Sequence, residues 1–302
     1  MICDLCPRRC GAVRTETAGH GRCGMPSLPV VARAALHLWE EPPISGTRGA
    51  GTVFFSGCPL GCVFCQNESI SHDNFGKPIS VERLRVIFLE LIAQGAHNID
   101  LVNPTHFAHA VGEALSEPLP VPVVWNSGGY DRVETLRAME GKVDIYLPDL
   151  KYLRPETAAR YSGAPDYPKA AQAAILEMFR QTGPCVCDGE GLLRRGVVIR
   201  HLILPGRLSE AKEVMDWVAE HFRPGEVLFS LMSQYTPWGR AADFPEIDRT
   251  LRRSEQRAAE EYMAALGLKG FVQEGSSASS SFIPAFDLTG VSCSQASQTN
   301  KI

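Results

Sequence analysis

The sequence lacks several features that would point to particular classes of protein. None of its apolar runs is long enough to cross a membrane, and its first residues hold cysteine and arginine where a secretory signal needs an apolar core. Its net charge of -4 offers no basic surface for nucleic acid. We therefore expect a cytoplasmic protein whose partners include neither membrane nor nucleic acid. A length of 302 residues, 44% of them hydrophobic, suits one large core rather than two full domains.

Cysteine, in contrast, is plentiful. Most of the ten cysteines fall into two clusters, which favours reduced metal ligands over a disulfide framework. The central cluster, Cys58, Cys62 and Cys65, follows a short apolar strand expected at 53–55. It lacks the fourth thiolate of a closed tetrahedral site, whereas a four-iron cluster held by three cysteines keeps one iron open to a ligand. The alternative interpretation is a zinc knuckle or three thiols in the core.

A second cluster lies at the N-terminus, where Cys3, Cys6, Cys10 and Cys23 fall among glycines that let the chain fold tightly. Four thiolates make a closed site, which is structural or transfers electrons because no coordination position remains for chemistry. Zinc and an auxiliary iron–sulfur cluster both fit this pattern. Surface thiols on a flexible arm are the alternative. We expect residues 1–28 to form a Cys-rich metal-binding extension.

From residue 53 onward, apolar strands alternate with helices, which is typical of a parallel α/β sheet with right-handed crossovers. Strands are expected at 53–55, 98–102, 121–125, 143–147, 197–204, 227–232 and 270–273, and helices at 80–95, 108–115, 132–139, 169–181, 210–221 and 247–266. Six such units would make an incomplete (β/α)6 barrel within residues 29–274. The segment 29–39 is expected to run extended along its bottom or edge.

The other connections follow from this pattern. In a barrel the loops after strands meet at one end, where barrel enzymes place their sites, and the cysteine loop lies there. Cys185 and Cys187 fall in a helix-to-strand connection at the opposite end, and we expect them to be structural.

Residues 275–302 are expected to form a serine-rich tail that docks through 282–288 and is disordered at its end.

The order Cys-x3-Cys-x2-Cys, with Phe64 just before Cys65, resembles the signature of the radical S-adenosylmethionine family. The resemblance implies a partial (β/α)6 barrel and a [4Fe-4S] cluster on Cys58, Cys62 and Cys65, whose open iron binds S-adenosylmethionine. In that family the reduced cluster cleaves S-adenosylmethionine to methionine and a 5′-deoxyadenosyl radical, which abstracts a hydrogen atom. An oxygen-sensitive oxidoreductase with a flavodoxin or ferredoxin electron donor is also implied.

Four further segments extend the resemblance over most of the chain. Residues 41–49, 94–99, 143–151 and 231–235 are similar to an uncharacterised subgroup akin to the pyruvate formate-lyase activating enzymes. Such enzymes act on a glycine of a partner glycyl radical enzyme. The resemblance therefore implies that activation of a glycyl radical enzyme is one function open to this chain.

The resemblance also assigns polar residues to the cofactor. Phe64 and the backbone near Asn67 would border the adenine, and Asn103 and Thr105 would bind the amino acid part. The family's common Gly-Gly-Glu is absent at this last position, although a polar turn is retained. Asn126 and Ser127 are expected at the ribose, with an ordinary turn as the alternative.

Three basic side chains in or after later strands complete the expected cofactor site. Lys151 either pairs with Asp149 or binds a carboxylate of cofactor or substrate. Arg200 and His201 are consecutive in an apolar strand, so one of them faces inward and is expected to contact the cofactor.

Aromatic and amide side chains in the loops near 126–130, 151–168 and 234–240 are expected to wall a substrate pocket, with surface packing as the alternative. They are Tyr130, Tyr152, Gln234, Tyr235 and Trp238. Three functions stay open: an activator of a glycyl radical enzyme, a radical enzyme acting on a small molecule or peptide, and a non-catalytic iron–sulfur or zinc redox sensor. The sequence does not identify the substrate.

Overall fold

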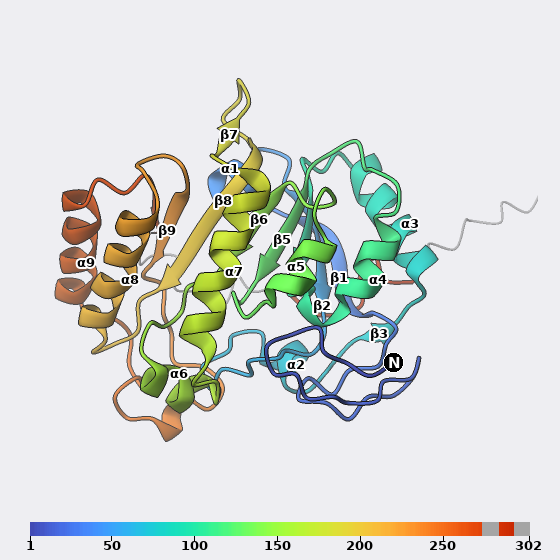
Figure 1. The fold of residues 1–302 in the computed structure, drawn as a ribbon, viewed down its shortest axis with the longest axis horizontal. Helices are drawn as coiled ribbons and strands as arrows, with labels where there is room; N and C mark the ends of the chain where they lie inside the picture. Colours follow the sequence, from blue (N-terminus) through green and yellow to red (C-terminus); the bar gives the residue numbers. More distant parts are fainter. Residues whose placement is uncertain (274–283, 293–302) are drawn as a thin grey trace, which may run out of the picture.

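The structure, a computed structural model, describes residues 1–273 and 284–292 (Figure 1). Its centre is one sheet with strands in the order β10-β9-β8-β6-β5-β4-β2-β1-β3. The pairs from β2 to β10 are parallel, whereas β1 pairs antiparallel with β2 and β3. The strands are β1 (Val30–His37), β2 (Ala50–Phe55), β3 (Lys77–Pro78), β4 (Ile99–Val102), β5 (Val123–Ser127), β6 (Ile145–Pro148), β7 (Val186–Cys187), β8 (Leu193–Leu202), β9 (Leu228–Met232) and β10 (Gly270–Gln273).

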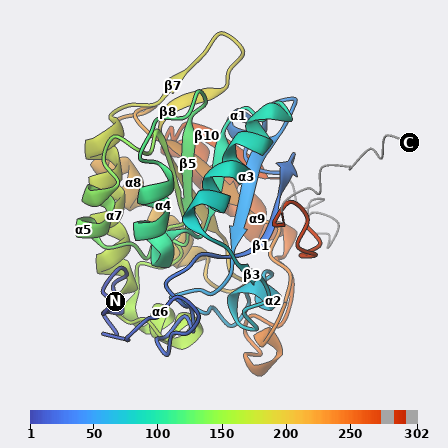
Figure 2. The same ribbon diagram turned by 90° about the vertical axis from the view of Figure 1, so that its right-hand side faces the viewer.

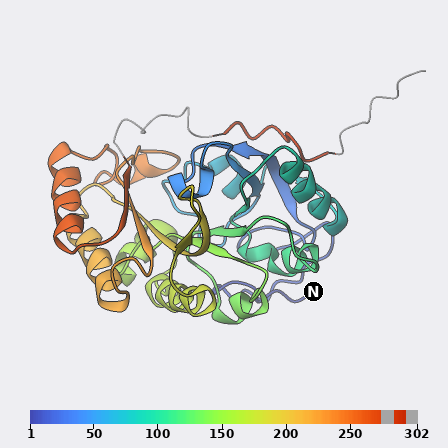
Figure 3. The same ribbon diagram turned by 90° about the horizontal axis from the view of Figure 1, so that it is seen from above.

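Helices follow the parallel strands and cover the outer face of the curved sheet (Figure 3). Within the described residues they are α1 (Pro42–Ser45), α2 (Glu68–Ser71), α3 (Val81–Ala93), α4 (Ala108–Ala114), α5 (Val133–Ala138), α6 (Pro155–Ser162), α7 (Tyr167–Thr182), α8 (Leu208–His221) and α9 (Arg253–Ala265). The Ser80 side chain accepts a hydrogen bond from the Arg83 N–H and so caps α3 as predicted. The α/β class and the partial (β/α)6 barrel are confirmed by the strand–helix units from β2 to α9.

Three predicted segments are wrong in their boundaries or type. The segment 151–168, predicted as a loop, contains α6, which begins with Pro155 in its first turn and ends at Gly163 in the left-handed conformation. The helix predicted from 247 begins only at Arg253, because the Glu255 side chain caps the chain there by accepting from the Arg252 N–H. Strand β8 begins before residue 197, because it forms an antiparallel hairpin with β7.

The edge of the sheet at β1 is covered by residues 284–292. The Ala34 N–H donates to the Thr289 carbonyl (2.8 Å), and the Leu288 N–H donates to the Ala32 carbonyl (3.0 Å). The segment 29–39, predicted to run extended along the bottom or edge of the sheet, contains β1, which lies next to the outermost strand β3. Residues 284–288, within the predicted docking segment, contact β1. The predicted serine-rich spacer and the far C-terminal end lie outside the described residues.

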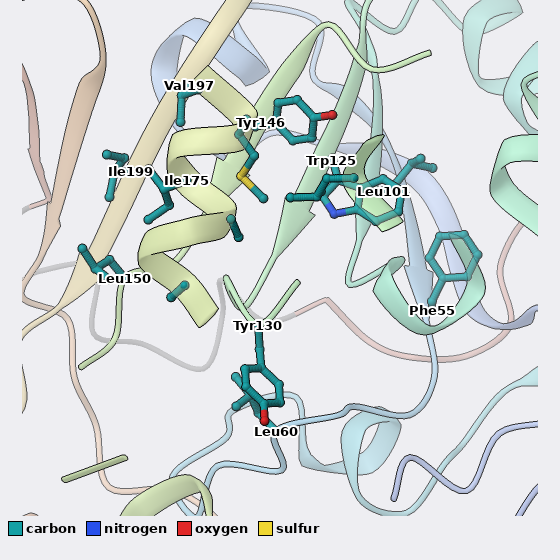
Figure 4. Close-up of a cluster of buried hydrophobic side chains, with 14 of the residues drawn as sticks. Phe55, Leu60, Leu101, Trp125, Tyr130, Tyr146, Leu150, Ile175, Val197 and Ile199 are labelled. Atoms are coloured by element: carbon teal, nitrogen blue, oxygen red, sulfur yellow. The ribbon is translucent and has the colours of Figure 1, made fainter. Parts of the chain in front are cut away.

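The main hydrophobic core lies between the sheet and its helices (Figure 4). Trp125 and Tyr146 from the central strands and Ile175 from α7 are fully buried in it. Burial of each such side chain contributes about 1.5–3 kcal/mol, which makes this layer the main support of the strand ends. Among the helices that the structure describes, none is both long and apolar enough to span a bilayer.

The two ends of the sheet differ in what they carry. The N-terminal segment, α2 and α6 lie together at one end, and β7 projects from the opposite end (Figures 1 and 2). The cysteine loop, which connects β2 to α2, therefore lies at the end with α2 and α6. Cys185 and Cys187 belong to the β7 hairpin at the other end and are free thiols.

Candidate functional site

The loop that carries the three central cysteines begins where β2 ends. Gly57 has a φ of 80°, and its N–H donates to the Ile70 carbonyl of α2 (2.7 Å). A Cβ at this position would lie 2.4 Å from Cγ of Met25. Glycine is therefore required for the N-terminal segment to pack against the start of the loop.

The middle of the cysteine loop is fixed from two other directions. The Val63 N–H donates to the Tyr161 carbonyl of α6 (2.9 Å), and the Val63 carbonyl accepts from the Arg240 N–H (2.8 Å). Segments far apart in the sequence thus set the backbone between Cys62 and Cys65. This is the rigid placement that a metal-binding loop needs.

All three central cysteines line one cavity of about 270 Å³. Each sulfur accepts a hydrogen bond from a side chain, Cys58 from Asn103 Nδ2 (3.3 Å), Cys62 from Ser162 Oγ (3.0 Å) and Cys65 from Ser71 Oγ (3.2 Å). Hydrogen bonds to ligand sulfurs orient the ligands and adjust the reduction potential of an iron–sulfur cluster.

The electrostatics of the cavity favour the protonated form of Cys58 and Cys65 in the absence of metal. Burial, together with the neighbouring thiols, raises the pKa of Cys65 to about 12. Burial also raises the pKa of Cys58, and the Cys62 thiol adds to this shift. A bound metal centre supplies the positive charge that would convert such thiols to thiolates.

The donor set of three soft sulfurs is of the chemical type that binds an iron–sulfur cluster. Within residues 1–273 and 284–292, no group of three or more His, Cys, Asp or Glu side chains is arranged around a single metal ion. A four-iron cluster is several atoms wide, so its ligands stand around a space rather than around a point. Three soft sulfurs on one cavity wall, each with a hydrogen-bond donor, suit such a cluster.

A charged network forms another wall of this cavity. Asp149 accepts from Lys151 Nζ (2.5 Å) and from Arg200 Nε (2.9 Å), and Arg200 also donates to Asn126 Oδ1 (2.6 Å). Burial alone would raise the pKa of Asp149, but the two cations outweigh it and hold the pKa below its usual value. The predicted Asp149–Lys151 pair is present, and both side chains line the cavity.

Buried carboxyl groups adjoin this network. Asp100 and Glu41 are almost completely buried, and Asp100 Oδ1 and Glu41 Oε2 have no hydrogen-bond partner among the described residues. Burial raises the pKa of Asp100 well above its usual value, and the nearby Glu40 raises it further. Burial likewise raises the pKa of Glu41, against the opposing effect of Arg200.

The predicted cofactor residues divide into two groups. The described lining of the cavity includes Phe64, Asn67, Asn103, Asn126, Ser127, Lys151 and Arg200. Thr105 and His201 lie outside it: Thr105 Oγ1 donates to Asp131 (2.6 Å), and the His201 Nδ1–H donates to the Leu150 carbonyl (2.7 Å). Burial lowers the pKa of His201 to about 4, so this ring is neutral. Of the two consecutive residues in β8, Arg200 is the one that faces the cavity.

The predicted substrate residues are also divided. Gln234 and Tyr235 line the cavity. Tyr130 and Tyr152 are buried behind it, where the Tyr130 hydroxyl donates to Asp166 (2.8 Å) and the Tyr152 hydroxyl contacts Ser162 Oγ (3.0 Å). Trp238 is 39% exposed in the loop after β9 and is not part of the cavity's described lining.

The N-terminal cysteines gather beside the cysteine loop. Cys3 and Cys6 are buried, Cys23 is half-buried and Cys10 is exposed, and all four are free thiols. Burial raises the pKa of Cys6 to about 12, and the thiols of Cys23, Cys3 and Cys10 add to the shift. The four thiols thus lie near enough to influence one another's charge, although in the described part of the chain no three of them are grouped around a single metal ion.

Several residues of the site had no signal in the sequence. Ser71 and Ser162 donate to cysteine sulfurs but look like ordinary helix-end serines. Leu202 and Met232, at the ends of β8 and β9, line the cavity and resemble any strand residue. Asp100 could have been noticed as an acid within an otherwise apolar strand.

The parallel sheet, with its cysteine loop after the first parallel strand, has the fold of radical S-adenosylmethionine enzymes. The chain resembles a radical SAM methyltransferase from Sphaerobacter thermophilus with a TM-score of 0.50 and 14% identity, over 74% of this chain and 66% of that one. It also resembles Streptococcus suis SuiB, in a structure bound to S-adenosylmethionine, with a TM-score of 0.49 and 13% identity. That match covers 72% of this chain and 48% of SuiB, so the chain spans about half of that protein.

A relative in sequence places the chain more closely. The chain is 30% identical over 263 residues to the uncharacterized protein MJ0674 of Methanocaldococcus jannaschii, covering 84% of this chain and 71% of that protein. It belongs to the family of that protein. No family model matches the sequence.

Proposed function

We propose that this chain is a radical S-adenosylmethionine enzyme in which Cys58, Cys62 and Cys65 hold a [4Fe-4S] cluster. The observation that carries the proposal is the meeting of the three sulfurs on one cavity, each with its own hydrogen-bond donor. When bound there, the cluster would supply the electron for cleavage of S-adenosylmethionine and hence a radical that abstracts hydrogen.

The chain's own residues have distinct tasks in this proposal. Asn103, Ser162 and Ser71 orient the sulfurs. Lys151 and Arg200 present positive charge to the cavity, where the carboxylate of S-adenosylmethionine needs a partner. Asn126 and Ser127 face the same space from the next strand and offer hydrogen bonds to the ribose.

The apolar part of the cavity would shield the reaction. Phe55, Phe64, Leu202 and Met232 contribute side chains without polar hydrogens to the cavity lining. Such a lining would exclude water from the reacting groups. Gln234 and Tyr235 border this region and are proposed to contact the substrate.

The test is cleavage of S-adenosylmethionine. Protein reconstituted anaerobically with iron and sulfide, then given dithionite and S-adenosylmethionine, should form 5′-deoxyadenosine. Cys62→Ala should abolish product, whereas Cys187→Ala, which alters an exposed thiol at the other end of the sheet, should leave it unchanged. A wild type that carries the cluster but forms no product would favour the redox-sensor function instead.

Two further parts of the proposal concern partners. The N-terminal thiols would hold zinc or an auxiliary iron–sulfur cluster, and a flavodoxin or ferredoxin would supply electrons. Metal analysis of a variant with Cys58, Cys62 and Cys65 all replaced by alanine measures the N-terminal site alone. No metal in that variant would contradict a second site.

The hydrogen donor is proposed to be a glycine of a glycyl radical enzyme, with a small molecule or peptide as the second candidate. The support for the first is the likeness of residues 143–151 and 231–235 to activating enzymes, because both segments end at the cavity. A stable protein radical in a partner, seen by electron paramagnetic resonance, would establish it. A released small product would establish the second.

A further inference from the structure

One side chain of the N-terminal extension reaches into the site described above. Arg8 donates from Nε to the Pro59 carbonyl (2.9 Å) and from Nη2 to the Leu60 carbonyl (3.4 Å), both in the loop between Cys58 and Cys62. The same guanidinium donates from Nη2 to the Ser162 carbonyl (2.9 Å) and from Nη1 to the Gly163 carbonyl (2.5 Å). One side chain thus joins the cysteine loop to the C-terminal end of α6.

The geometry suits arginine in particular. The last carbonyls of a helix lack partners within the helix, and a cation there is favoured by the helix dipole. Arg8 also lies over the Tyr130 ring, with Cζ 5.4 Å from its centroid, and Tyr130 and Leu60 are drawn together at one end of the core in Figure 4. A planar fork with five donors can reach four carbonyls and stack on a ring, whereas a lysine ammonium cannot.

The two segments that Arg8 joins are the ones that set the environment of Cys62. Ser162, whose carbonyl accepts from Arg8, donates its hydroxyl to Cys62 Sγ (3.0 Å). The preceding residue, Tyr161, accepts the Val63 N–H (2.9 Å). A shift between loop and helix would break both contacts at once. Arg8 therefore influences the position of the Cys62 sulfur through the backbone of Ser162 and does not contact the sulfur itself.

The position of Arg8 in the chain adds a second consequence. It lies in the turn Cys6-Pro-Arg-Arg-Cys10, which is closed by a hydrogen bond from the Arg9 N–H to the Cys6 carbonyl (3.1 Å). Metal bound by the N-terminal thiols would hold this turn, and with it the base of the Arg8 side chain. Arg22 of the same extension also donates to the Leu60 carbonyl (3.2 Å).

We propose that Arg8 is a positioning residue that clamps the cysteine loop to α6 and links the N-terminal thiol site to the geometry around Cys62. The link rests on the proposed second metal site, whereas the clamp rests only on the contacts of Arg8. The N-terminal extension thus affects the conformation of the cysteine loop and is not an independent metal-binding segment.

The clamp is tested on the protein without metal, by measuring hydrogen exchange of the Val63 amide. This amide donates to the Tyr161 carbonyl and so connects the cysteine loop to α6. Arg8→Ala should speed this exchange about tenfold or more, because hydrogen bonds from a charged donor are lost and the joint opens locally. Arg9→Ala is the matched control: it alters an exposed arginine of the same turn and should change the rate less than about twofold. The Gly57 amide, bonded to α2, serves as an internal control.

Equal rates of Val63 exchange in Arg8→Ala and Arg9→Ala would overturn the clamp. An equal increase in the exchange rates of all core amides would overturn it too. If Arg8→Ala does not fold, Arg8→Lys keeps the charge without the fork and should still accelerate Val63. In reconstituted protein, Arg8→Ala should also change the electron paramagnetic resonance spectrum of the reduced cluster, while Arg9→Ala should match wild type. A wild type that takes up no cluster would contradict the proposed function and leave the exchange result decisive for Arg8.

The link is tested with Zn²⁺ in the variant that lacks Cys58, Cys62 and Cys65. Zn²⁺ should slow Val63 exchange in that variant, and adding Arg8→Ala should remove the slowing, as in a double-mutant cycle. Zn²⁺ that binds without changing Val63 exchange would overturn the link. Failure to bind Zn²⁺ or iron would contradict the second metal site itself.

Discussion

The Ser162 hydroxyl donates a hydrogen bond to Cys62 Sγ at 3.0 Å, although the two residues are 100 positions apart in the sequence. Ser162 is the last residue of α6 and is almost fully buried. Its contact places a neutral donor on a sulfur that would carry negative charge when it binds iron. The hydrogen bond therefore favours the more reduced, more negative state of a cluster on that sulfur.

Ser162→Ala should lower the reduction potential of the cluster. The change removes one stabilising donor, and a net hydrogen bond of about 1 kcal/mol corresponds to a shift on the order of 50 mV for one electron. Redox titration followed by electron paramagnetic resonance measures it. Ser71→Ala, which removes the donor to Cys65, should shift the potential in the same direction, and Ser80→Ala, at the cap of α3, should not. An unchanged or raised potential in Ser162→Ala would contradict this role.

Asp100→Asn should change how stability depends on pH. Burial and the nearby Glu40 raise the pKa of Asp100 in the folded protein, whereas the unfolded value is about 3.9. Between these two values the folded state holds a proton that the unfolded state releases, so wild-type stability falls as pH rises, by up to about 1.4 kcal/mol per pH unit. Asn126 and Arg200 face the same carboxyl and limit the shift.

The amide cannot ionise, so Asp100→Asn should be at least as stable as wild type at pH 8 and lose its advantage toward pH 5. Urea unfolding of the metal-free protein at both pH values gives the comparison. A difference between variant and wild type that stays constant with pH would show that Asp100 does not hold the proton.

Two adjacent glycines at the end of β5 should respond differently to alanine. Gly129 has a φ of 75°, and a Cβ there would lie 2.0 Å from the Asp149 carbonyl oxygen, a backbone atom. Gly128 has an ordinary φ, and its Cβ would meet the flexible end of Leu60 at 3.0 Å. Gly129→Ala should therefore destabilise the protein by roughly 3 kcal/mol, and Gly128→Ala by roughly 1 kcal/mol or less. Thermal unfolding measures both, and equal losses would contradict the strain argument.

The fold could be predicted because its signals are local. Buried parallel strands such as β4 (Ile99–Val102) and β9 (Leu228–Met232) are short apolar runs, and α3 has an apolar face and a serine cap. Helix α6 was missed because its eight residues are largely polar or small, although Pro155 and Gly163 marked both ends. Tertiary contacts with the cysteine loop, rather than its own apolar face, define that helix.

The candidate site could be predicted only where its residues are close in sequence. The three cysteines lie within one loop, so their meeting needs no knowledge of the fold. Alternation showed that Arg200 and His201 face opposite ways, but which one faces the cavity depends on the register of β8 beside β9, where Arg200 pairs with Ser230. The contacts of Ser162 and Arg8 join segments more than 50 residues apart, and no local pattern announces them.

Lys151→Met should weaken the binding of S-adenosylmethionine. Lys151 Nζ pairs with Asp149 at 2.5 Å on the cavity wall, and that pair raises the pKa of Lys151 against the opposing effect of burial, so the side chain stays charged. Losing its attraction for a carboxylate should raise the dissociation constant about tenfold, a change of about 1.4 kcal/mol. Asp149 keeps Arg200 as a partner, so the variant should still fold.

Calorimetric titration of the reconstituted protein measures the affinity for S-adenosylmethionine. Lys142→Met is the control, because its Nζ donates to the Leu115 carbonyl (2.8 Å), away from the cysteine cavity. Equal affinities in the two variants would remove Lys151 from the binding site and leave it as the counter-ion of Asp149.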